Sequence, residues 1–573
     1  MSAQFKTHKQ ASKLMWLIFT IMAPVSTYLM LMNKTLLIEW VLFSISSTPV
    51  MFTMIVDPSG TLFACTVLII SANVLQFSTT YMKEDKFIDR FTVLVLLFVL
   101  SMNLLIFLPH LMMLLLGWDG LGLVSFILVI YYQNPKSLAA GMITALTNRI
   151  GDVMLLLSIA WTLDQGQWNI IHMWESGPIT LQAAAITLAA MTKSAQMPFS
   201  SWLPAAMAAP TPVSALVHSS TLVTAGVFLL IRFYPFLGCT PWFNQSLLLV
   251  AVSTTTMAGL SAMTECDMKK IIALSTLSQL GMMMAAMGLE MVNLAYFHMI
   301  THALFKALLF ICAGTLIHSH SHSQDLRWMG NITMQMPTTT SCFMLANMAL
   351  CGAPFMSGFY SKDMIIESSI FFSHNAIMLM IILFTVSLTS FYTMRFSLAT
   401  IWGPNNSTPF MHLEETPALT TPMLILSSMS IISGASLVWV LPYNQEPMTM
   451  SLIMKTMPML MIITGLTTAW YVTTAHIKQK PAMMIMSMTH HASCLMWFLI
   501  PLSSQFTMKS PMYISHNYLK SLDQSWLEIM GGQGTLNTSH LTSNFMMKLF
   551  DTKPVNYLVM SALLATLILT LTY

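Results

Sequence analysis

A set of titratable side chains lies inside apolar stretches of the sequence, where charges are rare. A charge at the centre of a bilayer costs at least about 2.5 to 3.5 kcal/mol, so these residues need a reason to be there. A buried lysine releases its proton near neutral pH when a nearby carboxylate moves or is neutralised, and histidine titrates near neutrality. A row of such groups could therefore pass protons across a membrane. The residues at membrane depth are Asp119, Arg149, Asp152, Lys193, His218, His298, His302, Lys306, Lys362, Asp363, Glu367 and Arg395.

Charge is scarce along the whole chain. Of its 573 residues, 55% are hydrophobic and only 8% are charged, whereas about 25% are charged in a soluble domain. Because a spanning helix needs about 20 apolar residues and windows of that size recur along the chain, we predict an all-α polytopic membrane protein. The net charge of +3 and the lack of a long basic run argue against a nucleic-acid partner.

Apolar windows bounded by Pro, Gly and charges predict about fifteen spans. Segment 36–58 is predicted to form an extended hairpin outside the membrane, and 483–503, with His490 and His491, to lie in the interface. Lys and Arg outside the spans concentrate on the side of the N-terminus, and a sixteenth span would weaken this bias. The predicted spans are 14–33, 61–80, 91–108, 110–131, 140–163, 179–199, 211–233, 246–264, 270–289, 293–317, 338–371, 375–400, 419–441, 453–475 and 554–572.

Two of these spans are interrupted by residues that break helices. Prolines separate Lys193 from His218, and each removes a backbone donor and blocks a helical hydrogen bond. A second Pro/Gly break comes just before Lys362. Paired interrupted segments are typical of transporters built from inverted repeats around a polar cavity, so we predict two such repeats. The interrupting residues are Pro198, Pro204, Pro210 and Pro212 in the first segment, and Gly352, Pro354 and Gly358 in the second.

Several of the titratable residues also have structural interpretations. Arg149 and Asp152 are three residues apart and could form an ion pair along one helix. His298 and His302 share a helix face and could hydrogen-bond between helices. Arg395, near a span end, is expected to extend toward the interface. A scaffold that keeps polar residues only to join helices is therefore the alternative to a proton row.

The sequence predicts neither a metal nor a redox cofactor on this chain. Its seven cysteines include no Cys-x-x-Cys pair and no spacing typical of haem or iron–sulfur ligands. His318, His320 and His322 lack an adjacent Cys or paired carboxylate, which favours a solvated histidine cluster over a metal site. Methionine is abundant, at 56 residues, either because it replaces Ile and Leu on lipid-facing positions or because the gene is read by an animal mitochondrial code in which an isoleucine codon means methionine.

At the motifs that carry these residues, the chain resembles the chain 5 family of mitochondrial NADH:ubiquinone oxidoreductase, respiratory complex I. The long block at 193–233 is the most specific match, and the resemblance extends over 110–370. In this family the acid position usually holds Glu, so Asp119 is one methylene shorter. The matching stretches are GWDGLGLVSF (117–126), NRIGD (148–152), 193–233, DMKKIIALSTLSQLG (267–281), FHMITHALFKALLF (297–310) and GFYSKDMIIE (358–367).

The resemblance implies a proton-translocating subunit of the inner-membrane arm, with its N-terminus on the matrix side. It implies that NADH, FMN, iron–sulfur clusters and ubiquinone act elsewhere in the complex, and that the partners are other membrane-arm and accessory subunits and lipids such as cardiolipin. A cation/proton antiporter subunit of the Mrp type is the alternative. The implied proton-transfer residues are Asp119, Lys193, His218, Lys306 and Lys362, with roles left open for Arg149, Asp152, His298, His302 and Asp363.

The resemblance also implies five regions. We expect the antiporter-like core to follow a block of N-terminal spans, and a lateral amphipathic helix and an anchor span to close the chain. Leu519, Leu522, Trp526 and Ile529 give the lateral segment a partial heptad spacing, which a group of glycines is expected to interrupt. The expected regions are 1–108, 109–400, 401–504, 505–553 and 554–573, and the glycines are Gly531, Gly532 and Gly534.

Overall fold

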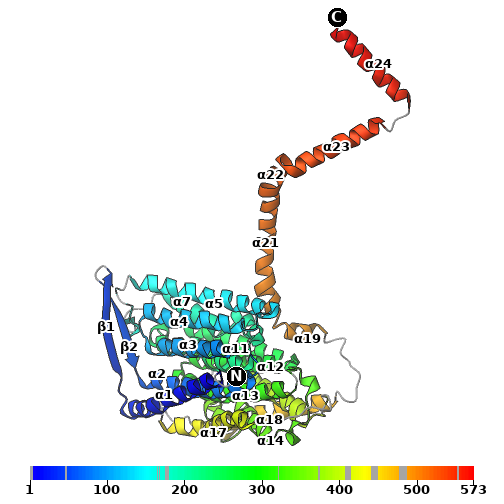
Figure 1. Cartoon of the computed structure of the whole chain (residues 1–573). Helices are drawn as coiled ribbons and strands as arrows, with labels where there is room; N and C mark the ends of the chain where they lie inside the picture. The colour runs from blue at the N-terminus through cyan, green and yellow to red at the C-terminus, as the bar shows by residue number, and fades with distance from the viewer. Residues whose placement is uncertain are drawn as a thin grey trace. The chain divides into compact units, whose positions relative to one another are not determined.

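The chain divides into two compact units, residues 1–500 and 501–573, which are treated separately below. The structure is a computed structural model, shown in Figure 1. It describes residues 4–45, 48–163, 166, 168–173, 180–320, 322–371, 375–404, 406, 415–440, 450–475, 487–550 and 554–572.

Thirteen helices among the described residues are long and apolar enough to cross a membrane. The two predicted spans missing from this set, 179–199 and 338–371, are the interrupted ones. The prediction of about fifteen spans therefore resolves into thirteen continuous helices and two broken segments. The continuous helices of the first unit are α1 (Gln4–Met32), α2 (Pro58–Tyr81), α3 (Ile88–Phe107), α4 (Leu111–Val129), α5 (Pro135–Thr162), α10 (Leu222–Leu237, in a span that starts at Thr211), α11 (Phe243–Thr264), α12 (Met268–Gly288), α13 (Val292–Ser319), α16 (Ala376–Ser397, continued by η8 to Trp402), α17 (Pro417–Val440) and α18 (Leu452–Ala475).

Helices α12 and α13 form the centre of the first unit (Figure 1). Both are buried over the whole of their most apolar window, and α2 is 89% buried, whereas α1 and α18 are only 22% buried. A helix that is apolar all round is expected inside such a bundle. Most Ser and Thr hydroxyls in these helices donate to a carbonyl three or four residues back, so they can be buried without a cost in unpaired donors. The bundle therefore encloses the apolar middle of both helices.

The first broken segment follows α7 (Thr180–Lys193), which is only 14 residues long. A chain of short helical turns then leads back into a continuous helix. The turn that carries His218 is a π-helix, a form that recurs at functional sites. The turns are η2 (Phe199–Ser201), α8 (Trp202–Ala205), η3 (Ala206–Ala208), α9 (Thr211–Val213) and η4 (Ser214–Thr221).

The second broken segment follows α14 (Pro337–Cys351), which ends at Gly352. Gly352 has φ +85°, a left-handed conformation that glycine adopts without steric cost and that commonly ends helices. A Cβ on Gly358 would lie within 1.8 Å of the Ala349 carbonyl oxygen, so the returning chain can pass only with glycine there. The chain continues through the π-helical turn η7 (Phe359–Asp363) into α15 (Met364–Phe371).

The predicted pairing of two strands within 36–58 is confirmed. Strands β1 (Leu36–Ile45) and β2 (Thr48–Val56) pair antiparallel, with Leu36 opposite Val56. Within 483–503, residues 483–486 lie outside the described part. The rest forms α19 (Ser487–Cys494) and α20 (Leu499–Pro501), which are too short to span a bilayer. Three further short helices are α6 (Ile170–Met173), η5 (Leu326–Trp328) and η6 (Ile332–Met334).

Nearly all described residues of the second unit are helical. The apolar positions Leu519, Leu522, Trp526 and Ile529 are all exposed within this unit. The prediction that three glycines interrupt this helical segment was wrong in part. Only Gly531 falls between helices, whereas Gly532 and Gly534 lie within the helix that follows, because a helix tolerates glycine at modest cost. The helices are η9 (Leu502–Phe506), α21 (Thr507–Tyr518), η10 (Leu519–Asp523), α22 (Gln524–Met530), α23 (Gly532–Phe550) and α24 (Pro554–Leu571).

Candidate functional site

Lys193, the last residue of α7, is fully buried. Its Nζ donates a hydrogen bond of 2.6 Å to the carbonyl oxygen of Trp118 on α4. The same amine lies 3.9 Å from the centre of the Trp118 ring, so the ring face stabilises its positive charge as well. Trp118 therefore holds the lysine where the first helix breaks.

Two carboxylates surround this lysine. Asp152 on α5 accepts a hydrogen bond of 2.8 Å from Trp118 Nε1 and lies 3.4 Å from Arg149, so the predicted ion pair is confirmed. Asp152 and Asp119 both interact electrostatically with Lys193, and Asp152 does so more strongly. The sequence interpretation paired Lys193 with Asp119 alone, whereas the fold adds Asp152, which interacts with the lysine more strongly.

His218 lies on the π-helical turn η4 and is 1% exposed. Its ring packs edge-on against Trp202, with 6.2 Å between ring centres. Trp202 in turn donates a hydrogen bond of 3.0 Å to the carbonyl of Thr192, the residue before Lys193. Within the described part of the chain, neither ring nitrogen of His218 has a hydrogen-bond partner.

Helix α13 carries His298, His302 and Lys306 at intervals of four residues, which places them along one face. The Lys306 amine donates to the hydroxyl of Ser275 on α12. The rings of His298 and His302 lie 6.1 Å apart, and neither nitrogen of His302 has a partner among the described residues. These three side chains form a buried polar column inside the bundle.

His298 connects this column to the second broken segment. Its Nδ1 lies 2.9 Å from the hydroxyl of Ser361 on η7, and its Nε2 lies 3.1 Å from Gln279 Oε1 on α12. The hydroxyls of Ser361 and Thr301 are 3.1 Å apart. The interpretation of His298 as a link between helices is therefore supported, and the link leads directly to Lys362.

Lys362 is 1% exposed and donates a hydrogen bond of 2.8 Å to Thr389 Oγ1 on α16. The sequence suggested a terminal pair of Lys362 and Asp363. In the described residues no direct ion pair joins them, because the amine turns toward Thr389, although the two still interact electrostatically. The Asp363 Oδ1 atom is buried with no hydrogen-bond partner among described residues.

The contacts bring the predicted residues into two groups rather than one continuous chain. One contains Asp119, Asp152 and Lys193, and the other extends from Lys306 to Lys362, while His218 makes no hydrogen bond to either within the described residues. Sequence reasoning missed Trp118, Ser275, Gln279, Ser361 and Thr389. Ser275 and Gln279 are four residues apart, which places both on one face of α12, and this spacing was a sequence signal that could have pointed to them.

Other charged residues have structural partners. Arg395 donates a hydrogen bond of 2.5 Å to the carbonyl oxygen of Met263 at the end of α11, and this hydrogen bond caps the helix. Among the described residues, no group of three or more His, Cys, Asp or Glu is placed to hold a metal ion. The structure therefore offers no metal centre in those regions.

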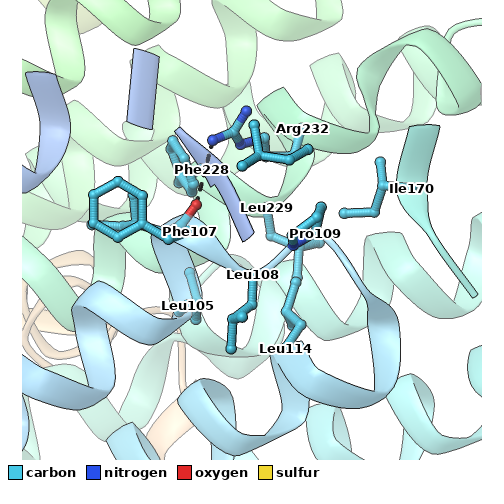
Figure 2. A pocket seen from close by; sticks show the side chains of 11 residues that line it. Leu105, Phe107, Leu108, Pro109, Leu114, Ile170, Phe228, Leu229 and Arg232 are labelled. Atoms are coloured by element: carbon cyan, nitrogen blue, oxygen red, sulfur yellow. Dashed lines mark hydrogen bonds between the residues drawn. The ribbon is translucent and has the colours of Figure 1, made fainter. Parts of the chain in front are cut away.

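Arg232 on α10, which lies at a span edge, forms a pair that the sequence did not suggest. It donates to both carboxylate oxygens of Asp57, at 2.6 and 2.7 Å, and to the Ile106 carbonyl at 3.3 Å. Burial raises the pKa of the Asp57 carboxyl, but the Arg232 charge and hydrogen bonds outweigh this effect and hold that pKa below its ordinary value. Figure 2 shows Arg232 beside a small apolar cavity of about 10 Å³, room for about one water molecule, so this pair joins elements rather than binding a ligand.

Three family models match successive parts of the chain. Residues 108–389 match the model described as NADH:quinone oxidoreductase/Mrp antiporter, TM. Residues 392–572 match NADH dehydrogenase subunit 5 C-terminus, and 40–92 match NADH-ubiquinone oxidoreductase (complex I), chain 5 N-terminus.

Full-length relatives and a solved structure agree with these matches. The chain is 66% identical to NADH-ubiquinone oxidoreductase chain 5 of Lumbricus terrestris over 98% of both chains. It is 46% identical to the protein of that name from Anopheles gambiae, over 89% of this chain and 88% of the relative. A structure of the Mrp complex from Dietzia sp. superposes with a TM-score of 0.69 at 21% identity, over all of this chain and 62% of that one, which shows a shared fold. The chain therefore belongs to the NADH-ubiquinone oxidoreductase chain 5 family of respiratory complex I.

Proposed function

We propose that this chain moves protons across the mitochondrial inner membrane as a membrane subunit of NADH:ubiquinone oxidoreductase. The observation that carries the proposal is the set of buried amines. Lys193, Lys306 and Lys362 are each 0 to 1% exposed and each has a polar partner on another helix. Amines buried at membrane depth are costly and are typical of ion pathways.

In this proposal the first group controls proton release from Lys193. Asp152 and Asp119 favour the charged amine, and any movement of Asp152 toward Arg149 weakens that support. The lysine then gives up its proton to an acceptor in the bundle. Trp118 holds both the Lys193 amine and the Asp152 carboxylate, so it positions the pair without taking the proton itself.

The second group carries the proton onward. Lys306, His302 and His298 stand in one column, and Ser361 connects His298 to the turn that holds Lys362. A hydroxyl both donates and accepts, so Ser361 can pass a proton between neighbouring groups. Thr389 and Asp363 complete the end of the route.

Water completes the gaps in this route. The ring nitrogens of His218 and His302 and one oxygen each of Asp119 and Asp363 are buried and, among the described residues, have no protein partner. Buried polar groups are nearly always hydrogen-bonded to protein or to ordered water. These atoms mark where water molecules would join Lys193 to Lys306 through His218.

The proposal extends to the setting of the chain. We infer from its basic loops that the N-terminus faces the matrix. Electron transfer from NADH to ubiquinone takes place on other subunits, which carry the FMN and iron–sulfur clusters, and cardiolipin is among the surrounding lipids. The core at 109–400 does the pumping, flanked by spans at 1–108 and 401–504, while 505–553 lies along neighbouring subunits and 554–573 anchors it.

The test replaces Lys306 by Met in the assembled complex, reconstituted in vesicles. Proton translocation per NADH oxidised should fall by at least about tenfold, because a transfer group is lost. Lys34→Met, at an exposed position, is the matched control and should leave translocation unchanged. Unchanged pumping in Lys306→Met would instead support the scaffold interpretation, and sodium flux without NADH oxidation would support an antiporter.

A further inference from the structure

His298 differs in its surroundings from the other two histidines of the proton route. Both of its ring nitrogens contact protein groups: Nδ1 lies 2.9 Å from the Ser361 hydroxyl, and Nε2 lies 3.1 Å from Gln279 Oε1. The ring nitrogens of His218 and His302 have no protein partner among the described residues. His298 therefore has no ring nitrogen left for a water molecule.

The Gln279 side chain lies on a turn of α12 that is held on two sides. Gln279 is fully buried, and so is the most apolar window of its helix. The hydroxyl of Ser278, the residue before it, lies 3.2 Å from the Tyr392 hydroxyl on α16. One turn earlier, Ser275 accepts a hydrogen bond from Lys306 on α13. The backbone that carries Gln279 is therefore fixed, and its freedom of movement is that of the side chain.

The two partners of His298 differ in their ability to exchange protons. A hydroxyl both donates and accepts, so Ser361 can pass a proton to or from Nδ1. The oxygen of a side-chain amide only accepts hydrogen bonds, so Gln279 binds the Nε2–H group without taking its proton. A reversed amide would only donate to Nε2, with the same result. Gln279 therefore occupies Nε2 with a group that carries no proton onward.

This contact interrupts transfer through the histidine. A histidine relays a proton by gaining it at one ring nitrogen and releasing it from the other. A proton from Ser361 can enter at Nδ1, but the Nε2 proton is held and cannot leave toward His302, whose ring centre is 6.1 Å away. A proton from His302 likewise finds no free nitrogen. His298 is thus closed to transfer in both directions while Gln279 holds Nε2.

We propose that Gln279 is a positioning residue that makes His298 a gate in the proton route, closed while the amide contacts Nε2 and open when the amide moves aside. The inference rests on the proposed function. In the open state Nε2 is free to exchange with water or with His302, and each step moves one proton between nitrogen or oxygen atoms while no other bond changes. The closed gate stops protons from flowing back through the route between turnovers.

The first experiment removes the amide. Gln279→Met in the assembled complex, in vesicles, is placed under an imposed pH gradient without NADH. Passive proton flow should rise by about tenfold, because a minor open state is populated to about 10% or less and becomes the only state. Gln76→Met is the matched control, because Gln76 also joins two helices, at 2.7 Å from Thr421, but lies outside the route. Unchanged passive flow in Gln279→Met would overturn the gate.

The second experiment asks whether the leak runs through His298. His298→Gln added to Gln279→Met keeps a polar side chain but removes the proton carrier, so passive flow should return to the level of the unmodified complex. A leak that persists in the double variant would show that Gln279→Met only loosens the packing, and the gate would be rejected.

The proposed function is tested separately in the same vesicles. If Lys306→Met stops pumping while Gln279→Met shows no leak, the gate fails and the proposed function stands. If Lys306→Met pumps normally, the proposed function itself fails.

Discussion

The two broken segments hold their lysines in different ways. At the first break, Lys193 is surrounded by two carboxylates and the Trp118 ring. At the second, the closest partner of Lys362 is the neutral hydroxyl of Thr389, and its neighbouring acid makes no direct ion pair with it within the described residues. Both amines donate to a neutral oxygen, and neither makes a direct ion pair within the described residues. The breaks therefore differ in the charge around the lysine, with two carboxylates at the first and one neighbouring carboxylate at the second. Two repeats with similar breaks can thus serve different steps of one transfer.

The largest effect should come from removing charge at the first break. Asp152→Asn keeps a side-chain oxygen that accepts the hydrogen bond from Trp118, but it removes the negative charge that interacts most strongly with Lys193. Proton translocation should therefore fall by about tenfold or more. Asp119→Asn should have a smaller effect, and Asp363→Asn at the second break a smaller effect still. Proton translocation per NADH in vesicles measures all three. Equal losses in Asp152→Asn and Asp363→Asn would remove the distinction between the breaks.

An intermediate effect should come from removing the hydroxyl at the second break. Thr389→Val leaves the Lys362 amine without its closest partner, at a cost of about 1 to 3 kcal/mol. Translocation should therefore fall a few-fold while the complex still assembles. Thr385→Val, one turn away on the same helix and bonded to its own helix backbone, is the control. A Thr389→Val complex that pumps normally would show that Lys362 needs no such partner.

The smallest effect on pumping should come from the Asp57–Arg232 pair, which lies outside both breaks. In the folded protein, the pKa of the Asp57 carboxyl lies below its ordinary value. The pair therefore stabilises the fold at pH values above the pKa that Asp57 has in the unfolded chain, and this stability is lost as the pH falls through the folded-state pKa. Asp57→Asn should lower the melting temperature at neutral pH by about a few degrees and flatten its dependence on acid pH. Translocation per NADH should stay normal. A loss of pumping without a loss of stability would place this pair in the proton route.

Much of the architecture follows from local sequence rules. The first break is marked by Pro198, Pro204, Pro210 and Pro212, and the second by Gly352, Pro354 and Gly358. The spacing of His298, His302 and Lys306 predicts that they share one helix face. The partners of these residues could not be predicted, because they depend on tertiary contacts. Trp118 and Lys193 are 75 residues apart, and Ser361 is 63 residues from His298. No periodicity encodes such a distance.

The enclosure of the apolar middle of α12 and α13 has a pharmacological consequence. Every residue in the most apolar window of each helix is covered by other helices. A hydrophobic inhibitor dissolved in the bilayer would meet only the outer helices and would have to part them to reach Lys306. Compounds that act on the proton route from within the lipid are thus expected to bind at its ends.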